Sequence, residues 1–152
     1  MTLPPHNRLA YALRMVRTWT HLRHYRGHNV HSPFVYGLIR QAIVPRKAKH
    51  PDEAAYRELR DSGLPHRAAV QLLNLQAYCP EYALRIVPAA QTPHSTAPEA
   101  PAIDCLLLPR WTPTRYRQIR EQIAAHDGAS IDNRRYVLLI HDARLTKKHY
   151  NL

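Results

Sequence analysis

The sequence predicts an α/β fold, chiefly from two short apolar runs and the helical segment between them. Residues 103–108 and 136–140 read IDCLLL and YVLLI, runs without helical period that are typical of buried strands. Between them, Thr112 and Pro113 start a helix that Gly128 ends. Because a strand, a helix and a second strand commonly form a right-handed crossover, we expect the two strands to be parallel neighbours.

Two helices are expected in the first third of the chain. Apolar residues recur there at helical spacing, which predicts a first helix over residues 7–25. Ser32 and Pro33 then form a start signal, a capping hydroxyl followed by a proline at the first helical position. The second helix should run from Pro33 to Val44.

The middle of the chain predicts two more helices, a strand and a linker. Acidic residues open a short helix over residues 52–62, and apolar residues at helical intervals predict another over residues 66–78. Residues 82–87, YALRIV, form a candidate strand. Residues 88–102 contain four prolines and almost no large apolar side chain, which indicates a linker.

The charge divides the chain into two unequal parts. Residues 1–51 contain nine Lys or Arg and no acidic residue, so they carry most of the net charge of +11. The helices expected up to residue 79 and the strands expected after it divide the chain into a basic helical arm, residues 1–79, and an α/β part, residues 80–152. Such a charge asymmetry points to an anionic partner.

The glycines exclude the common nucleotide-binding motifs. Only four occur, Gly27, Gly37, Gly63 and Gly128, and they are at least ten residues apart. The chain therefore has neither the G-x-G-x-x-G of a dinucleotide site nor a phosphate-binding loop.

Basic side chains form a stripe along the first predicted helix. Arg14, Arg17, His21, His24 and His28 are three or four residues apart, so they share one side of it. This pattern has three interpretations. The stripe could bind an anionic partner such as nucleic acid, or two of its histidines could hold a divalent cation. The third interpretation is an ordinary solvated face of the helix. Because the neighbouring arginines repel cations, we expect no metal.

Three polar residues lie in or after the predicted strands and are candidates for binding a cofactor. Asp104 lies inside the strand of residues 103–108, and His141 and Asp142 follow the strand of residues 136–140. Ligands of parallel sheets bind beyond the carboxyl ends of strands, which favours Asp142 over Asp104. An ordinary structural role, with Asp142 capping the next turn, is the alternative.

One segment resembles a known family. Residues 27–39 read GHNVHSPFVYGLI, and the core of the match is His31, Ser32, Pro33 and Phe34. This segment resembles the N-terminal region of class I S-adenosylmethionine-dependent methyltransferase-like proteins of Bacteroidetes-type bacteria, whose helical arm carries a similar HSPF motif. YREL and LLNLQAYCP follow in an order similar to that of the family.

The resemblance implies a Rossmann-like sheet after Pro80, with S-adenosylmethionine held by a glycine-rich loop after its first strand. Here EYALRIVPAAQTPH follows Pro80 and contains no glycine. We therefore expect a catalytically inactive remnant of a methyltransferase that binds no cofactor. Two alignments to the family stay open for the segment RRYVLLIHDARLTKKHY. In the first, it corresponds to the family's fifth strand and IDCLLL corresponds to the fourth. In the second, it corresponds to the family's last strand and C-terminal tail.

The alternative function is a basic adaptor that binds anions or nucleic acid through the N-terminal Arg/His helix. A sheet of two or three strands has open edges, so we also expect a homo-oligomer or a partner chain that covers them. Cys79 and Cys105 lie in apolar surroundings, which predicts buried reduced thiols and a cytoplasmic protein. No segment has the pattern of a membrane span or signal peptide.

Overall fold

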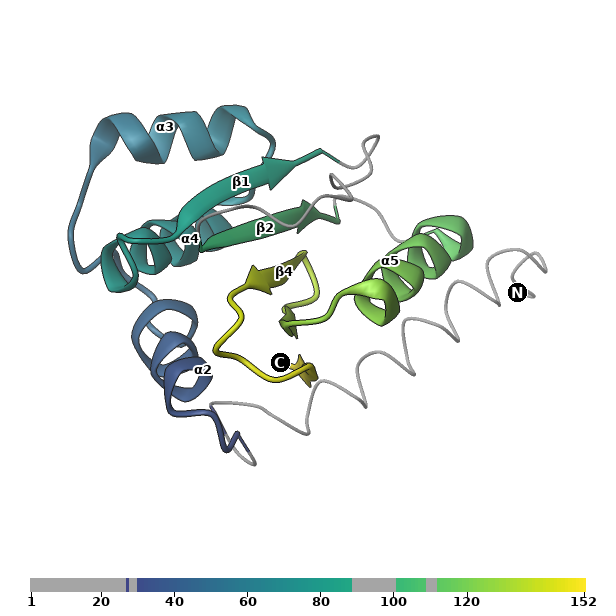
Figure 1. Ribbon diagram of the computed structural model, residues 1–152. Coiled ribbons are helices and arrows are strands. Elements are labelled where there is room, and N and C mark those ends of the chain that lie inside the picture. Colours follow the sequence, from purple (N-terminus) through teal and green to yellow (C-terminus); the bar gives the residue numbers. More distant parts are fainter. Residues whose placement is uncertain (1–26, 28–29, 89–100, 109–111) are drawn as a thin grey trace, which may run out of the picture.

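The computed structural model describes residues 27, 30–88, 101–108 and 112–152. In this part of the chain, helices and a five-stranded mixed sheet form an α/β fold, as the sequence predicts (Figure 1). The expected helix over residues 7–25 and most of the predicted linker lie outside the described residues. None of the described helices has the length and apolar character that crossing a membrane requires.

The predicted helix at Pro33 is confirmed, with a change of type along its length. In α2 (Pro33–Leu38) the proline stands at the first position, and the Ser32 hydroxyl accepts a hydrogen bond from the Val35 amide at 3.3 Å. The chain continues as a π-helix, η2 (Ile39–Ile43). The helical backbone therefore covers nearly the whole predicted range.

The other three predicted helices are confirmed within a few residues. They are α3 (Glu53–Asp61), α4 (His66–Tyr78) and α5 (Pro113–Ala125). The side chains of Asp52 and Thr112 cap α3 and α5 by accepting backbone N–H groups. Residues 68–75 of α4 are all buried, which makes α4 the central helix of the described fold.

The sheet has two strands more than the sequence predicts. Its strands are β1 (Ala83–Val87), β2 (Ala102–Leu107), β3 (Ala129–Asp132), β4 (Tyr136–His141) and β5 (Lys148–Asn151). They lie in the order β1-β2-β4-β3-β5. β1 is parallel to β2 and β3 to β5, whereas β4 is antiparallel to both of its neighbours.

The predicted parallel crossover from residues 103–108 to residues 136–140 is wrong. After α5 the chain first forms β3, and a tight turn then reverses it into β4. β4 therefore enters the sheet antiparallel to β2. The sequence of β3, ASID, is only four residues long and half polar, so it has no strand signal of its own.

Side-chain alternation along the strands creates a core on each face of the sheet. Ile103 and Cys105 point to the larger core, which α2, η2 and α4 also form. Leu106 and Leu139 point to the opposite face, where Ile119 of α5 packs against them. The larger core joins buried residues of the predicted helical arm and of the α/β part.

Both cysteines are buried and free, as predicted. Burial raises the pKa of the Cys79 thiol to about 12, with a smaller contribution from Glu81. The sheet ends at β1 on one side and at β5 on the other, and in the described part of the chain each pairs with one strand only. A partner chain that covers these edges stays a prediction.

Candidate functional site

The β1–β2 pair has two ends with different chemistry, and the strand register fixes which residues lie at each. Leu107 pairs with Tyr136 near the carboxyl end of β2, and Ala102 pairs with His141 near its amino end. Asp142, which follows β4, therefore lies at the amino end of β2. The expected position of Asp142 beyond the carboxyl ends of a parallel pair is wrong, because β4 runs antiparallel to β2.

At the amino end, Asp142 is enclosed by hydrogen bonds. The Arg144 guanidinium donates to both carboxylate oxygens, at 3.0 Å to Oδ1 and 2.8 Å to Oδ2, and the Tyr82 hydroxyl also donates to Oδ2. The hydrogen bonds from Arg144 hold the pKa of Asp142 well below its usual range. Burial and the hydrogen bond to Asp142 raise the pKa of Tyr82 to about 12.

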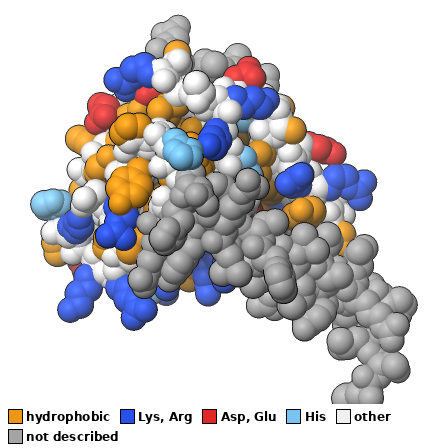
Figure 2. Space-filling view, turned by 90° about the horizontal axis from the view of Figure 1, so that it is seen from below, with side chains coloured by type: hydrophobic (Ala, Val, Ile, Leu, Met, Phe, Trp, Pro, Cys, Tyr) orange, Lys and Arg blue, Asp and Glu red, His pale blue; other side chains and the backbone are white. Residues whose placement is uncertain are grey.

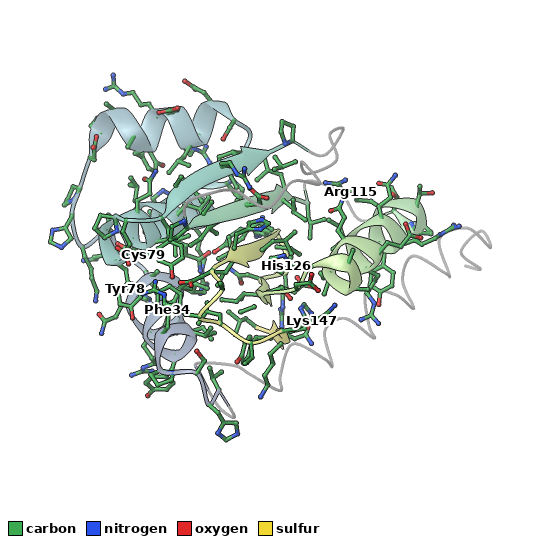
Figure 3. All side chains as sticks on the ribbon, in the orientation of Figure 1. Phe34, Tyr78, Cys79, Arg115, His126 and Lys147 are labelled. Carbon is green, nitrogen blue, oxygen red and sulfur yellow. The ribbon has the colours of Figure 1, made fainter. Side chains whose placement is uncertain are left out.

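The HSPF segment, residues 31–34, packs at the amino end of the β1–β2 pair. Phe34 stacks on Tyr82 with 5.3 Å between the ring centroids. Its ring centroid also lies 6.1 Å from that of Tyr78, and Figure 3 labels both of these residues. Ser32 caps α2 and Pro33 opens it, whereas His31 is exposed. The motif residues therefore start α2 and fasten it to the first strand.

Asp104 is sealed in the sheet, on the face that α5 covers. Arg85 donates from Nε to Oδ1 at 2.5 Å and from Nη2 to Oδ2 at 2.9 Å, and His141 Nε2 donates to Oδ2 at 2.8 Å. Burial favours the neutral acid, but the hydrogen bonds from His141 and Arg85 outweigh it and lower the pKa of Asp104. The Asp104 side chain is only 2% exposed.

His126 extends this polar cluster to the end of α5 (Figure 3). Its Nε2 lies 3.2 Å from the Ala129 carbonyl oxygen and 3.0 Å from that of Ile140, so Nε2 carries the proton. Its ring meets that of His141 edge to face, with 4.8 Å between the centroids. Burial and the neighbouring His141 lower the pKa of His126.

The three sequence candidates do not fit S-adenosylmethionine. Both oxygens of Asp104 and both oxygens of Asp142 already accept hydrogen bonds from neighbouring side chains. His141 donates to Asp104 and lies beside it in the sheet. The Asp104 side chain is 2% exposed and that of Asp142 is 5% exposed, so a ribose or amino group could reach either carboxylate only by displacing its present neighbours.

The carboxyl end of β1 and β2 is open and basic. A cavity of about 610 Å³ lies there, between the loop that joins α3 to α4 and the ends of the strands. Arg60, Leu64, Pro88, Leu107 and Arg135 are among its lining residues. No acidic side chain occurs among the described residues that line it. Its volume is typical of small-molecule sites, which span roughly 300–1,000 Å³.

A strained turn presents one of the two arginines to this cavity. Arg134 and Arg135 connect β3 to β4, and Arg134 has a φ of 55°, a value that favours glycine. Asp132 Oδ1 accepts the Arg134 amide at 3.1 Å, and the Arg135 carbonyl oxygen accepts the amide of Leu108 at 2.9 Å. These bonds hold the turn against the end of β2.

The buried side chain of Gln71, in α4, holds the β3–β4 turn in place through hydrogen bonds. Its Oε1 accepts hydrogen bonds from Asn133 Nδ2 and the Tyr136 hydroxyl, both at 3.0 Å. Its Nε2 donates to the Ile43 carbonyl oxygen at 2.8 Å. One buried amide thus ties η2, α4 and the β3–β4 turn together, so the position of Arg135 depends on the core.

The predicted basic stripe of Arg14, Arg17, His21, His24 and His28 lies outside the described residues. The part of the chain that is described contains no cluster of three or more His, Cys, Asp or Glu that could hold a metal ion.

Comparison with known proteins identifies no family. No family model, no curated protein and no solved structure matches the chain.

The sequence pattern does not mark Arg60 or Arg135 as a candidate for ligand binding. The pair Arg134-Arg135 lies between an unpredicted strand and a predicted one, so the tight turn was not visible in the sequence. Arg60 lies near the end of a predicted helix, where a basic residue is common for reasons of helix stability alone.

Proposed function

We propose that the chain is a methyltransferase-like protein that does not transfer methyl groups. The observation that carries this proposal is the chemistry of the cavity at the carboxyl ends of β1 and β2, where a Rossmann-like sheet would bind its cofactor. S-adenosylmethionine carries a positive sulfonium, whereas this cavity is lined by Arg60 and Arg135 and by no described acidic residue. Like charges in a partly enclosed site repel.

The sequence after β1 supports the same proposal. No glycine occurs between Gly63 and Gly128, so the sequence after β1 lacks the glycines that let a backbone approach a methionine moiety closely. The two candidate acids, Asp104 and Asp142, are held by internal hydrogen bonds. The loop and the acids that a cofactor would need are therefore missing or occupied.

The topology favours one of the two alignments to the resembled family. If residues 103–108 and 134–150 held the fourth and fifth strands of a Rossmann-like sheet, β2 and β4 would be parallel. They are antiparallel. We therefore align residues 134–150 with the last strand and C-terminal tail, and we propose that the first half of the sheet is reduced.

Calorimetric titration of the full chain with S-adenosylmethionine tests the proposed function. We expect no saturable heat, because Asp104 and Asp142 are held by internal hydrogen bonds and the described lining of the cavity is basic. Saturable binding with a micromolar Kd would contradict it. A transferase assay without activity would not be enough by itself, because the methyl acceptor is unknown.

The second candidate function, a basic adaptor for anionic partners, rests on the loop at residues 46–50. Buried Asn74 accepts the Lys49 amide at 2.8 Å and donates to the Lys47 carbonyl oxygen at 3.1 Å, while the side chains of the loop stay largely exposed. Figure 2 shows Lys and Arg side chains spread around the face seen from below, with few Asp or Glu. A fixed basic loop suits the phosphates of a nucleic acid.

The salt dependence of RNA or DNA binding tests the adaptor. Electrostatic binding predicts that log K falls linearly with log salt concentration. No binding at low salt, or an affinity that is indifferent to salt, would contradict it. A cytoplasmic location belongs to both proposals, and the buried free thiols of Cys79 and Cys105 suit a reducing compartment.

A further inference from the structure

The cavity at the carboxyl ends of β1 and β2 combines positive charge with an apolar lining. Its cationic groups are Arg60, from the end of α3, and Arg135, from the β3–β4 turn. Leu64, Leu107 and Leu108 supply apolar surface. Two guanidinium groups contributed by different elements could contact a ligand from two sides, with its apolar part against the leucines.

Neither guanidinium is neutralised within the described part of the chain. Arg60 Nη1 donates to the Leu64 carbonyl oxygen at 2.9 Å, which leaves its other N–H groups for a ligand. The Arg135 side chain makes no hydrogen bond or ion pair there. By contrast, Arg57 on the same helix as Arg60 forms an ion pair with Glu53 at 3.2 Å.

A third guanidinium adds positive charge behind the same strand end. Arg115 is 9% exposed, donates from Nη2 to the Leu107 carbonyl oxygen at 3.3 Å, and lies between α5 and the end of β2 (Figure 3). Its Nε has no hydrogen-bond partner among the described residues. Arg115 is not among the lining residues, but a buried cation without a carboxylate raises the positive potential around the cavity.

We propose that this cavity binds a phosphate monoester with an apolar organic part, through Arg60 and Arg135. A phosphate monoester is close to dianionic at neutral pH, which matches two guanidinium groups that can each donate two hydrogen bonds. The volume of about 610 Å³ and the leucines favour a small molecule over an extended nucleic-acid strand.

Calorimetric titration of the full chain with phenyl phosphate, at low salt, tests this proposal. We expect saturable binding by the wild-type chain, and weakening of about tenfold in Arg135→Gln and in Arg60→Gln, the loss of one charge-assisted contact. Phenol, which lacks the phosphate, should not bind. Thermal unfolding of each variant checks that it is folded.

Two neighbouring arginines provide matched controls. Arg134→Gln changes the same turn, and Arg57→Gln changes the same helix, but neither residue is among the lining residues. Both variants remove one charge, and both should keep the wild-type affinity within about twofold. Arg135→Lys keeps the charge without the planar fork and should give an intermediate affinity.

Three results would overturn the proposal. The first is that phenyl phosphate does not bind, and the second is that Arg134→Gln and Arg135→Gln weaken its binding equally. The third is that a short single-stranded oligonucleotide binds more tightly than phenyl phosphate, with an affinity that Arg135→Gln leaves unchanged. Titration with S-adenosylmethionine is a separate measurement, so failure of this proposal and failure of the proposed function are distinguishable.

Discussion

The two ends of the β1–β2 pair differ in whether their charged side chains are paired. At the amino end and along the strands, Asp142 and Asp104 accept hydrogen bonds on both oxygens from arginine, tyrosine and histidine. At the carboxyl end, Arg60 and Arg135 line a cavity that no described carboxylate shares. One end is closed and neutralised, and the other is open and basic.

This difference shows why residue type alone is a poor guide to a binding site. Asp104, His141 and Asp142 are the residues that a sequence search for chemistry selects, yet they form structural ion pairs and hydrogen bonds. A charged group can bind a ligand when its hydrogen-bonding capacity is free and a cavity adjoins it. In the described part of this chain, Arg135 meets both conditions.

The largest expected effect comes from opening the closed cluster at Asp104. Asp104→Ala should lower the free energy of unfolding by about 3–5 kcal/mol, because it leaves Arg85 and His141 without their buried partner. Urea unfolding measures this loss. Asp127→Ala, which removes a carboxylate that is 99% exposed, is the control and should change little. A loss below about 1 kcal/mol at Asp104 would mean that its contacts are not structural.

Gln71→Ala tests whether the core positions the open end. The change removes one hydrogen bond from each of the Ile43 carbonyl, Asn133 and Tyr136 and should cost about 2–3 kcal/mol in urea unfolding. Because Asn133 begins the turn that carries Arg135, phenyl phosphate should also bind more weakly. The control is Gln118→Ala on the exposed face of α5. Unchanged stability in Gln71→Ala would contradict the role of this amide.

The stability of the chain should fall on mild acidification, in part through His126. Its pKa is lower in the folded than in the unfolded protein, so below about pH 6.5 the unfolded chain binds the proton first and stability decreases. Between pH 7 and pH 5.5, the wild type should lose more stability than His126→Gln.

Urea unfolding at several pH values measures this difference. His50→Gln, at an exposed histidine of the basic loop, is the control and should keep the wild-type slope. A His126→Gln variant with the same pH slope as the wild type would contradict the assignment to His126.

The smallest effect is expected at Arg134, whose φ of 55° favours glycine. Arg134→Gly should raise the free energy of unfolding by up to about 1 kcal/mol, since the left-handed strain of a side-chain-bearing residue is removed. The affinity for phenyl phosphate should not change. A destabilised variant would show that the Arg134 side chain makes a contribution larger than its backbone strain.

The sequence predicted the local elements well and their assembly less well. Caps such as Ser32 and Thr112 and the runs IDCLLL and YVLLI are local signals, so the described helices and three strands were predicted within a few residues. β3 and β5 are four residues each, ASID and KHYN, and neither contains an apolar run. Without β3, the antiparallel entry of β4 could not be predicted.

The candidate site depended on that missing strand. Asp142 was placed at the wrong end of the sheet because the direction of β4 decides where it lies. Arg135 could not be recognised as a candidate from the sequence, because only the turn between β3 and β4 brings it to the end of β2. Pairings between segments distant in the chain, not local propensity, position both residues.

Amide chemical shifts of the isotope-labelled chain during titration with phenyl phosphate test the contrast between the two ends most directly. We predict that shifts concentrate at Gly63, Leu64, Leu108 and Arg135 around the cavity, while those of Ala83 and His141 at the amino end stay unchanged. Shifts concentrated at Ala83 and His141, or the same pattern with S-adenosylmethionine in place of phenyl phosphate, would contradict this account.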